Sequence, residues 1–476
     1  MLKTPLKIGI QMNSKLLSRA VGQLPAVKRS PMSFYSLVAI YIILILAPWA
    51  LSYIEGLQIR GWYEELVTLL SISGMAMMLC QFTLLNGRVD AINSRIGVDN
   101  SMRVHNKAGE YLAILFFLHP FLIGLPRFIV APSFALDNLW IMFTSAESAT
   151  GVYAWSLLIV LVLMAIKKNK VGLSYEAWRY THSVGFVAVI ILATHHAVTV
   201  GRHGRYNLWF DVLWIALCAV AVSVVGYVYF IRPRSVSKRP FTVVDCQKGS
   251  ADDWYLTIKK DADFQFEFDA GQFVWINTSG SAFKRNEHPF SIASSPRSLP
   301  ELSFVIRNLG DYTKQLGKLQ FGQRVWVDGP HGVFTLNARN AQGIVLLAGG
   351  AGIGPIIGIL RGLNDRGDTR PIRLIYGNRN MAQMMFLDEL IDMTKNMNLV
   401  TTLVLNDAPD DFPPTGFQGH KGFINQSVIE ATGQGYNTQN WDYYICGPQP
   451  MVKAVERTLQ QLEIPQSRIL YEQLGF

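Results

Sequence analysis

The feature that most constrains the fold is a series of long apolar runs in the first half of the chain. The hydrocarbon core of a bilayer is about 30 Å thick, and a helix of about 20 apolar residues crosses it. Six such runs lie at 33–53, 64–85, 105–126, 151–167, 180–200 and 208–231. From residue 237 onward the chain reads as a water-soluble protein. The sequence therefore predicts a multi-domain membrane protein that contains a six-helix transmembrane bundle over residues 33–231.

Basic residues indicate which ends of these runs face the cytoplasm. Lys and Arg are frequent in the tail over 1–32, in the loops after the second and fourth runs, and after the sixth run. The loops on the opposite side are poorer in Lys and Arg. The positive-inside rule then places both termini in the cytoplasm of a multi-pass plasma membrane protein. The net charge of +9 is explained by this orientation, and no nucleic acid is expected as a partner.

Histidines are concentrated in two of the apolar runs. Five of the nine histidines lie in the third and fifth runs: His105, His119, His182, His195 and His196. Fourteen residues separate His105 from His119, and His182 from His196, so each pair shares one helix face with about 21 Å between its members along the axis. His195 would lie about 140° away from that face. Two such helices side by side form two histidine pairs, which is typical of bis-histidine haem sites.

The second half of the chain contains two further patterns. "RPRSVSKRP" (232–240) is predicted to be a linker, and the short alternating segments that follow it predict an antiparallel β-barrel over 241–340. "GIVLLAGGAGIGPIIGIL" (343–360) then runs from a strand through a glycine loop into a helix. This pattern is typical of a nucleotide-binding turn and predicts an α/β Rossmann-like domain over 341–476. Its cofactor-binding residues are Gly349, Gly350, Gly352 and Pro355. A proton-relaying transporter, the other use of intramembrane histidines, is disfavoured by this nucleotide-binding half.

The membrane half resembles a known family. The six runs, the paired histidines and the segment "YEAWRYTH" (175–182) resemble the ferric reductase and NADPH oxidase superfamily, most closely its bacterial ferric-reductase-like members. The resemblance implies a bacterial inner membrane and two haem b groups. It implies that His105 pairs with His182 at the inner haem, and that His119 pairs with His196 or His195 at the outer one. The helix geometry favours His196, and the family leaves His195 open.

The flavin-binding residues are also suggested by resemblance. "HPFSIASSP" (288–296) resembles the flavin motif of ferredoxin-reductase-type enzymes, which implies that His288, Pro289, Phe290 and Ser291 hold FAD. "LGDYTKQL" (309–316) resembles the phosphate-contacting segment of these enzymes. The resemblance implies that Gly310 and Thr313 meet the pyrophosphate at a helix N-terminus.

The remaining coenzyme residues lie near the end of the chain. "CGPQPM" (446–451) resembles the nicotinamide-side motif, with Cys446 and Gly447 beside the carbon that transfers hydride. In the superfamily a terminal aromatic residue stacks on the flavin, which implies that role for Phe476. Phe476, Cys446 and Ser291 are thus the predicted catalytic residues. Arg379 is the candidate for the second phosphate of NADPH because arginine binds phosphate bidentately. NADH is the alternative coenzyme.

Together these patterns predict a transmembrane oxidoreductase. Electrons would pass from cytoplasmic NAD(P)H through FAD and two haems to a small external acceptor, a ferric chelate or O2. The alternative is a membrane subunit that delivers electrons to a partner protein, for which no sequence feature is specific. The external segment "GRHGRYN" (201–207) gathers Arg202, His203 and Arg205, and it is expected to hold haem propionates or attract an anionic acceptor.

Overall fold

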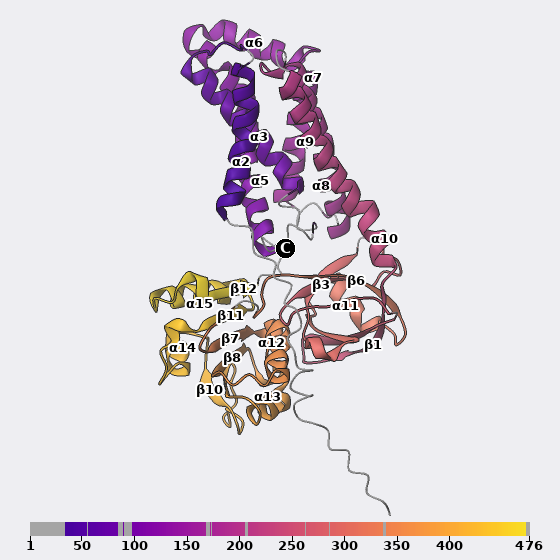
Figure 1. Cartoon of the computed structure of the whole chain (residues 1–476), viewed down its shortest axis with the longest axis vertical. Helices are drawn as coiled ribbons and strands as arrows, with labels where there is room; N and C mark the ends of the chain where they lie inside the picture. Colours follow the sequence, from indigo (N-terminus) through magenta and orange to yellow (C-terminus); the bar gives the residue numbers. More distant parts are fainter. Residues whose placement is uncertain are drawn as a thin grey trace, which may run out of the picture.

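The computed structural model of the 476-residue chain has two halves, stacked along its longest axis (Figure 1). A helical bundle forms one half, and two sheets with their helices form the other. The structure describes residues 34–54, 56–83, 89, 98–167, 172, 174–204, 208–261, 263–284, 286–336 and 339–472. The predicted basic tail over 1–32 lies outside the described residues.

Long apolar helices build the bundle. Their bounds are α2 Phe34–Ile54, α3 Trp62–Thr83, α5 Val98–Val130, α6 Pro132–Thr144, α7 Ala149–Ile166, α8 Tyr175–Thr199 and α9 Leu208–Gly226. Five of the described helices, namely α3, α5, α7, α8 and α9, are long and apolar enough to cross a membrane. The apolar part of α2 is shorter, at Ala39–Ile54, so the predicted count of six spans is not confirmed. The sequence did not predict α6, whose 13 residues are too few to span a bilayer.

The core of the bundle lies between α3, α8 and α9. Trp214 and Ile190 are fully buried there, and Phe210 and Met78 pack with them. In contrast, α5 exposes Ile114, Phe117 and other large apolar side chains on its outer surface. In a bilayer these side chains face lipid, which is as apolar as a protein core and does not penalise their exposure.

The last helix of the bundle continues into the second half of the molecule. A π-helical turn, η2 (Tyr227–Ile231), follows α9 directly and leads into α10 (Arg232–Ser237). Residues 232–240, predicted to be a linker, therefore form α10 and the start of the first strand. Pro233 does not break this helix because it lies in the first turn, where proline is tolerated.

The region predicted to bind flavin forms a six-stranded antiparallel sheet in the order β4-β3-β6-β1-β2-β5, called the flavin-binding sheet below. Its elements are β1 Pro240–Lys248, β2 Asp253–Lys260, β3 Phe273–Asn277, β4 Glu287–Ser291, β5 Glu301–Arg307, α11 Asp311–Gln315 and β6 Arg324–His331. An isolated bridge joins Ile292, just after β4, to Phe304 of β5, so the two edge strands approach each other. The antiparallel sheet was predicted correctly, whereas its closure into a barrel is not confirmed.

The nucleotide-binding half-module is a six-stranded parallel sheet in the order β10-β9-β8-β7-β11-β12. Its elements are β7 Ile344–Gly349, α12 Ile353–Asp365, β8 Ile372–Asn378, α13 Leu387–Thr394, β9 Leu399–Leu405, β10 Gln418–Lys421, α14 Gln426–Thr432, β11 Asp442–Cys446, α15 Gln449–Gln461 and β12 Ile469–Glu472. All residues of the central strands β7 and β11 are buried, as expected for parallel strands covered on both faces.

An arginine of α12 connects the two sheets of the soluble half. Arg361 forms a bidentate ion pair with Glu389 of α13, at 2.6 and 2.7 Å. The same guanidinium donates to the carbonyl of Ala293, 2.9 Å away in the flavin-binding sheet. Burial lowers the pKa of Arg361, but the bonds to Glu389 outweigh burial and raise it overall. The side chain therefore stays charged at all physiological pH values.

We predict that Arg361→Ala destabilises the soluble half. The substitution removes both bonds to Glu389 and leaves the carbonyl of Ala293 without this donor, which costs about 1–3 kcal/mol of unfolding free energy. The melting temperature of the detergent-solubilised chain, followed by tryptophan fluorescence, measures the loss. Arg366→Ala is the matched control because Arg366 is exposed at the end of the same helix. Equal effects of the two substitutions would contradict the prediction.

Candidate functional site

Two of the predicted histidines lie face to face near the soluble half. The ring centres of His105 on α5 and His182 on α8 are 6.3 Å apart, and their planes are inclined at 57°. Trp178 and Phe186, one turn before and after His182, flank its ring at 5.2 and 4.7 Å. The side-chain amide of Gln81 on α3 donates to the backbone carbonyl of His105 at 3.2 Å, which fixes α5 beside α3.

The second pair lies farther along the same two helices. His119 on α5 and His196 on α8 each follow the first histidine of their helix by fourteen residues. The Nδ1 atom of His119 lies 3.1 Å from the hydroxyl of Ser71, a hydrogen bond that orients the ring. The ring of His196 packs on Gly151 of α7, where an added Cβ would lie 2.6 Å from the ring. Glycine is therefore required at 151 for His196 to occupy this position.

The geometry of these histidines fits a bis-histidine metal site. Metal–imidazole bonds are about 2 Å long, so two rings that share one metal ion have centres about 6 Å apart. The His105–His182 pair has this separation. In the part of the chain that the structure describes, the buried Nδ1 atoms of His105, His182 and His196 have no hydrogen-bond partner. Buried polar atoms normally have partners, so these unsatisfied rings are suited to a bound group.

His195 is placed differently from its neighbour. Its side chain is exposed on the outer surface of α8, and its Nδ1 lies 3.3 Å from the hydroxyl of Thr150. His196, in contrast, is partly buried, and which of the two binds the outer haem stays a prediction. Just after α8, Arg202 donates to Glu65 at 2.7 Å, so its charge is compensated within the protein. Arg205 of the same segment lies outside the described residues.

The predicted flavin motif forms β4. His288 stacks on Tyr312 of α11 with ring centres 3.9 Å apart, and Phe290 lies parallel to the same tyrosine at 6.1 Å. Tyr312 is anchored by its hydroxyl, which donates to the carbonyl of Ile276 at 3.0 Å. Burial lowers the pKa of His288, so its imidazole is neutral at pH 7. Strand alternation places Pro289 and Ser291 on the opposite face of β4.

The predicted phosphate segment is capped internally. The backbone amides of Leu309 and Gly310 both donate to the Thr313 hydroxyl at 2.9 Å. These contacts hold the turn that precedes α11. The Gly310 amide already donates to the Thr313 hydroxyl. This hydrogen bond would have to break before either group could bind a phosphate.

A residue that the sequence did not identify connects the predicted catalytic groups. Glu472, at the end of β12, is 2% exposed, and its carboxylate accepts a 2.8 Å hydrogen bond from Ser291. Glu472 is also paired in register with Cys446 on the adjacent strand β11. The structure therefore brings Ser291 and Cys446, which are predicted for flavin and nicotinamide, to the two sides of one buried carboxylate. In the sequence, the one local indication of a functional residue here is that an acidic residue ends the otherwise apolar strand β12.

The glycine loop lies against the nicotinamide-side motif. The short 3-10 turn Gly350–Gly352 connects β7 to α12, and Pro355 is buried in the first turn of α12. A Cβ on Gly352 would lie 2.1 Å from the backbone oxygen of Cys446, so glycine is required there. Gly349 and Gly447 approach each other in the same way. This close contact joins the ends of β7 and β11 at the carboxyl edge of the sheet, where α/β folds bind their ligands.

Two arginines border this edge of the parallel sheet. Arg379, after β8, is 73% exposed and pairs with Asp407 at 2.9 Å. Arg307, which the sequence did not suggest, pairs with the buried Asp253 at 2.7 Å and extends beside Gly350. Arg379 is thus free to move, whereas Arg307 is held beside the predicted phosphate-binding turn. Phe476, the predicted flavin-stacking residue, lies outside the described residues and stays a prediction.

Three family models match the chain along its length. Residues 70–193 match the ferric reductase like transmembrane component, residues 242–335 match an FAD-binding domain, and residues 346–457 match the oxidoreductase NAD-binding domain. The first range includes both histidines of the inner pair. The other two ranges include β4 and the glycine loop.

Several characterised reductases are similar to part of the chain. The reductase component of propane 2-monooxygenase from Mycolicibacterium goodii is 29% identical over 44% of this chain and 59% of its own. The phenol 2-monooxygenase reductase component DmpP from Pseudomonas is 32% identical over 43% of this chain and 57% of its own. The γ subunit of sulfhydrogenase 2 from Pyrococcus furiosus is 30% identical over 43% and 71%. The chain thus spans about three-fifths of the length of the first relatives it matches.

Among solved structures, the cytochrome P450 reductase GcoB from Amycolatopsis is 25% identical, with a TM-score of 0.42 over 50% of this chain and 69% of its own. The matched ranges place a ferric reductase like transmembrane component before an FAD-binding domain and an oxidoreductase NAD-binding domain. These matches support a ferric reductase and NADPH oxidase-type flavocytochrome that uses NAD(P)H.

Proposed function

We propose that this protein moves electrons from cytoplasmic NAD(P)H across the plasma membrane to an acceptor on the other side. The observation that carries the proposal is the 6.3 Å separation of His105 and His182 inside the ferric-reductase-like domain. FAD converts a hydride into single electrons, and bis-histidine haems b transfer single electrons without binding O2 at the iron. The lipid bilayer surrounds α3, α5, α7, α8 and α9.

In this proposal the chain holds each group with residues already described. His105 and His182 hold the inner haem, and His119 and His196 hold the outer one. Their separation of about 21 Å along each helix places the two sites near opposite faces of the bilayer. Ser71 orients the His119 ring, and such outer hydrogen bonds are what fix an axial imidazole in place.

On the cytoplasmic side, the chain brings coenzyme and flavin together. His288, Phe290 and Ser291 of β4 line the FAD site, and the turn Gly350–Gly352 approaches the coenzyme phosphates. Cys446 lies beside the nicotinamide. The buried carboxylate of Glu472 accepts the hydrogen bond of the Ser291 hydroxyl and holds that side chain in place.

The overall reaction fixes the stoichiometry. Each NAD(P)H supplies two electrons, so it reduces two ferric ions to ferrous ions, or two O2 molecules to superoxide, and releases one proton. Purified protein in nanodiscs tests the proposal directly. We expect about two haems per chain by pyridine haemochrome, Soret reduction by NAD(P)H without oxygen, and turnover with ferric citrate or O2. Superoxide dismutase separates the two acceptors. A chain that binds no haem would refute the proposal.

A second candidate function is electron delivery to a partner protein. It is favoured by the similarity to reductase components of propane and phenol monooxygenases. The two functions differ in what the purified chain does alone. Steady turnover of ferric citrate without any added protein supports the first function, whereas reduced haems that persist until a partner protein is added support the second.

The neighbouring histidines of α8 provide a matched test of the outer haem site. His196→Leu removes the ring that packs on Gly151 and faces His119, so we expect haem content to fall from about two per chain to about one. His195→Leu alters an exposed ring and should leave haem content unchanged. Low-spin spectra and pyridine haemochrome measure both. Haem loss in the His195 variant alone would reverse the assignment.

Coenzyme preference tests the Arg379–Asp407 pair. We expect Arg379→Ala to raise the KM for NADPH about ten- to a hundredfold and to leave that for NADH nearly unchanged, because only NADPH has a 2′-phosphate to bind. Asp407→Asn should act in the opposite direction, since it removes a carboxylate that competes for Arg379 and repels phosphate. Steady-state rates with both coenzymes measure the effects. Equal changes for both coenzymes would place Arg379 away from the 2′-phosphate.

A further inference from the structure

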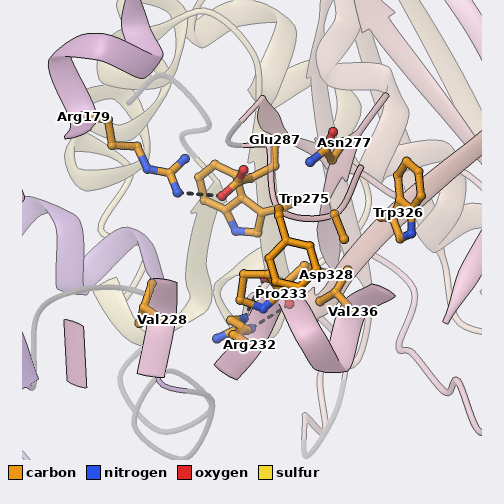
Figure 2. A pocket seen from close by; sticks show the side chains of 12 residues that line it. Arg179, Val228, Arg232, Pro233, Val236, Trp275, Asn277, Glu287, Trp326 and Asp328 are labelled. Atoms are coloured by element: carbon orange, nitrogen blue, oxygen red, sulfur yellow. Dashed lines mark hydrogen bonds and ion pairs between the residues drawn. The ribbon is translucent and has the colours of Figure 1, made fainter. Parts of the chain in front are cut away.

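Two ion pairs connect the membrane bundle to the flavin-binding sheet. The first joins Arg179, in the first turns of α8, to Glu287 at the start of β4. Its nitrogen–oxygen distance is 2.6 Å, and each side chain is only 17% exposed. Figure 2 shows the Arg179 side chain reaching across to Glu287, and both residues line a small cavity of about 40 Å³.

The second ion pair joins Arg232 of α10 to Asp328 of β6. Arg232 donates from two nitrogens to the two carboxylate oxygens, at 2.7 and 2.8 Å, and its side chain is 7% exposed. His331 lies 3.4 Å from the same guanidinium. Burial raises the pKa of Asp328, but His331 and Arg232 outweigh burial and lower it, so the carboxylate is ionised at pH 7. Such bidentate pairs have a fixed orientation as well as strength.

The first pair lies close to the redox residues along the chain. Arg179 precedes the inner histidine His182 by three residues, one helical turn. Glu287 directly precedes His288 of the flavin motif. This contact therefore joins the histidine helix to the flavin strand through very short stretches of covalent structure. The second pair supports the same sheet from α10, because Asp328 is in register with Trp275 of β3, the strand that pairs with β4.

The charges at this interface are complementary in a simple way. The bundle supplies both arginines, and the flavin-binding sheet supplies both carboxylates. Complementary charges fix the orientation of two docked surfaces, because a shifted arrangement would leave a charge without its partner. Apolar packing also contributes, since Met102 of α5 contacts the buried rings of Phe273 and Trp275. The adjoining cavity, however, leaves part of this interface unfilled (Figure 2).

We infer that the Arg179–Glu287 and Arg232–Asp328 pairs are positioning contacts that hold the flavin strand at a fixed distance from the inner histidine pair. Neither pair takes part in hydride transfer, which occurs at the carboxyl edge of the parallel sheet. Their role is to make electron transfer from the flavin to the membrane half fast and reproducible. The inference rests on the proposed function in one respect, namely that a haem in the membrane half accepts the electrons.

Charge reversal at the first pair separates docking from hydride transfer. In Arg179→Glu we expect NAD(P)H-driven reduction of ferricyanide, which takes electrons from the flavin, to stay within about twofold of wild type. Stopped-flow reduction of the haem Soret band should slow about thirtyfold, the effect of breaking a buried charge pair. The double variant Arg179→Glu with Glu287→Arg should recover most of the wild-type rate, since the pair is restored with its charges exchanged.

Lys107→Glu is the matched control. Lys107 lies on the same end of the bundle, its change in charge is the same, and its ion pair with Glu110 is exposed within α5. It should leave both rates unchanged. Amide hydrogen exchange gives a second readout that needs no haem: exchange over β3 and β4 should increase in Arg179→Glu and return to normal in the double variant.

The outcomes distinguish the inference from the proposed function. A Soret band that wild-type protein never reduces refutes the proposed function, and hydrogen exchange still decides whether the pair docks the sheet. Unchanged haem reduction in Arg179→Glu overturns the inference. So does a failure of the double variant to recover, or an equal loss of ferricyanide and haem reduction, because either result indicates general damage rather than lost positioning.

Discussion

A polar ring in the hydrocarbon core of a bilayer has no water to bond with, so its partners must come from the protein or from a bound group. This constraint explains the arrangement of the membrane half. Ser71 bonds His119, and Thr150 bonds His195, whereas the buried Nδ1 atoms of the inner pair have no partner among the described residues. The rings of His105 and His182, 6.3 Å apart, lie where α5 and α8 approach each other.

In the soluble half, buried carboxylates likewise need partners from elsewhere in the protein. Glu472 is buried beneath the flavin motif and is bonded to Ser291 from another domain. Asp328 is likewise held by Arg232 of α10, whereas Asp253 pairs with Arg307 on the adjacent strand of its own sheet. Each buried charge therefore requires two segments to be in place at once. Because an unpaired buried charge is costly, these contacts make the relative position of the domains specific as well as stable.

Sequence and structure agree where local pattern determines structure. Runs of about 20 apolar residues predicted the five helices that are long and apolar enough to cross a membrane, and the strand–glycine–helix pattern predicted the parallel sheet. Local pattern failed for short or context-dependent elements: α6 is too short to give a span signal, and Pro233 suggested a linker although it begins a helix. Glu472 and Arg307 were missed because their partners lie far away in the chain, and a contact between distant residues leaves no periodic trace in one sequence.

The unbroken helical path from Leu208 to Ser237 has a mechanical consequence. Because α9 and α10 are joined by a continuous helical path, a change in the tilt of α9 also moves Arg232 and the strand that Arg232 binds. Helices adjust their tilt to the thickness of the surrounding bilayer. Lipid composition would therefore affect the soluble half, and a bend at the π-helical turn Tyr227–Ile231 would reduce how much of the tilt reaches Arg232.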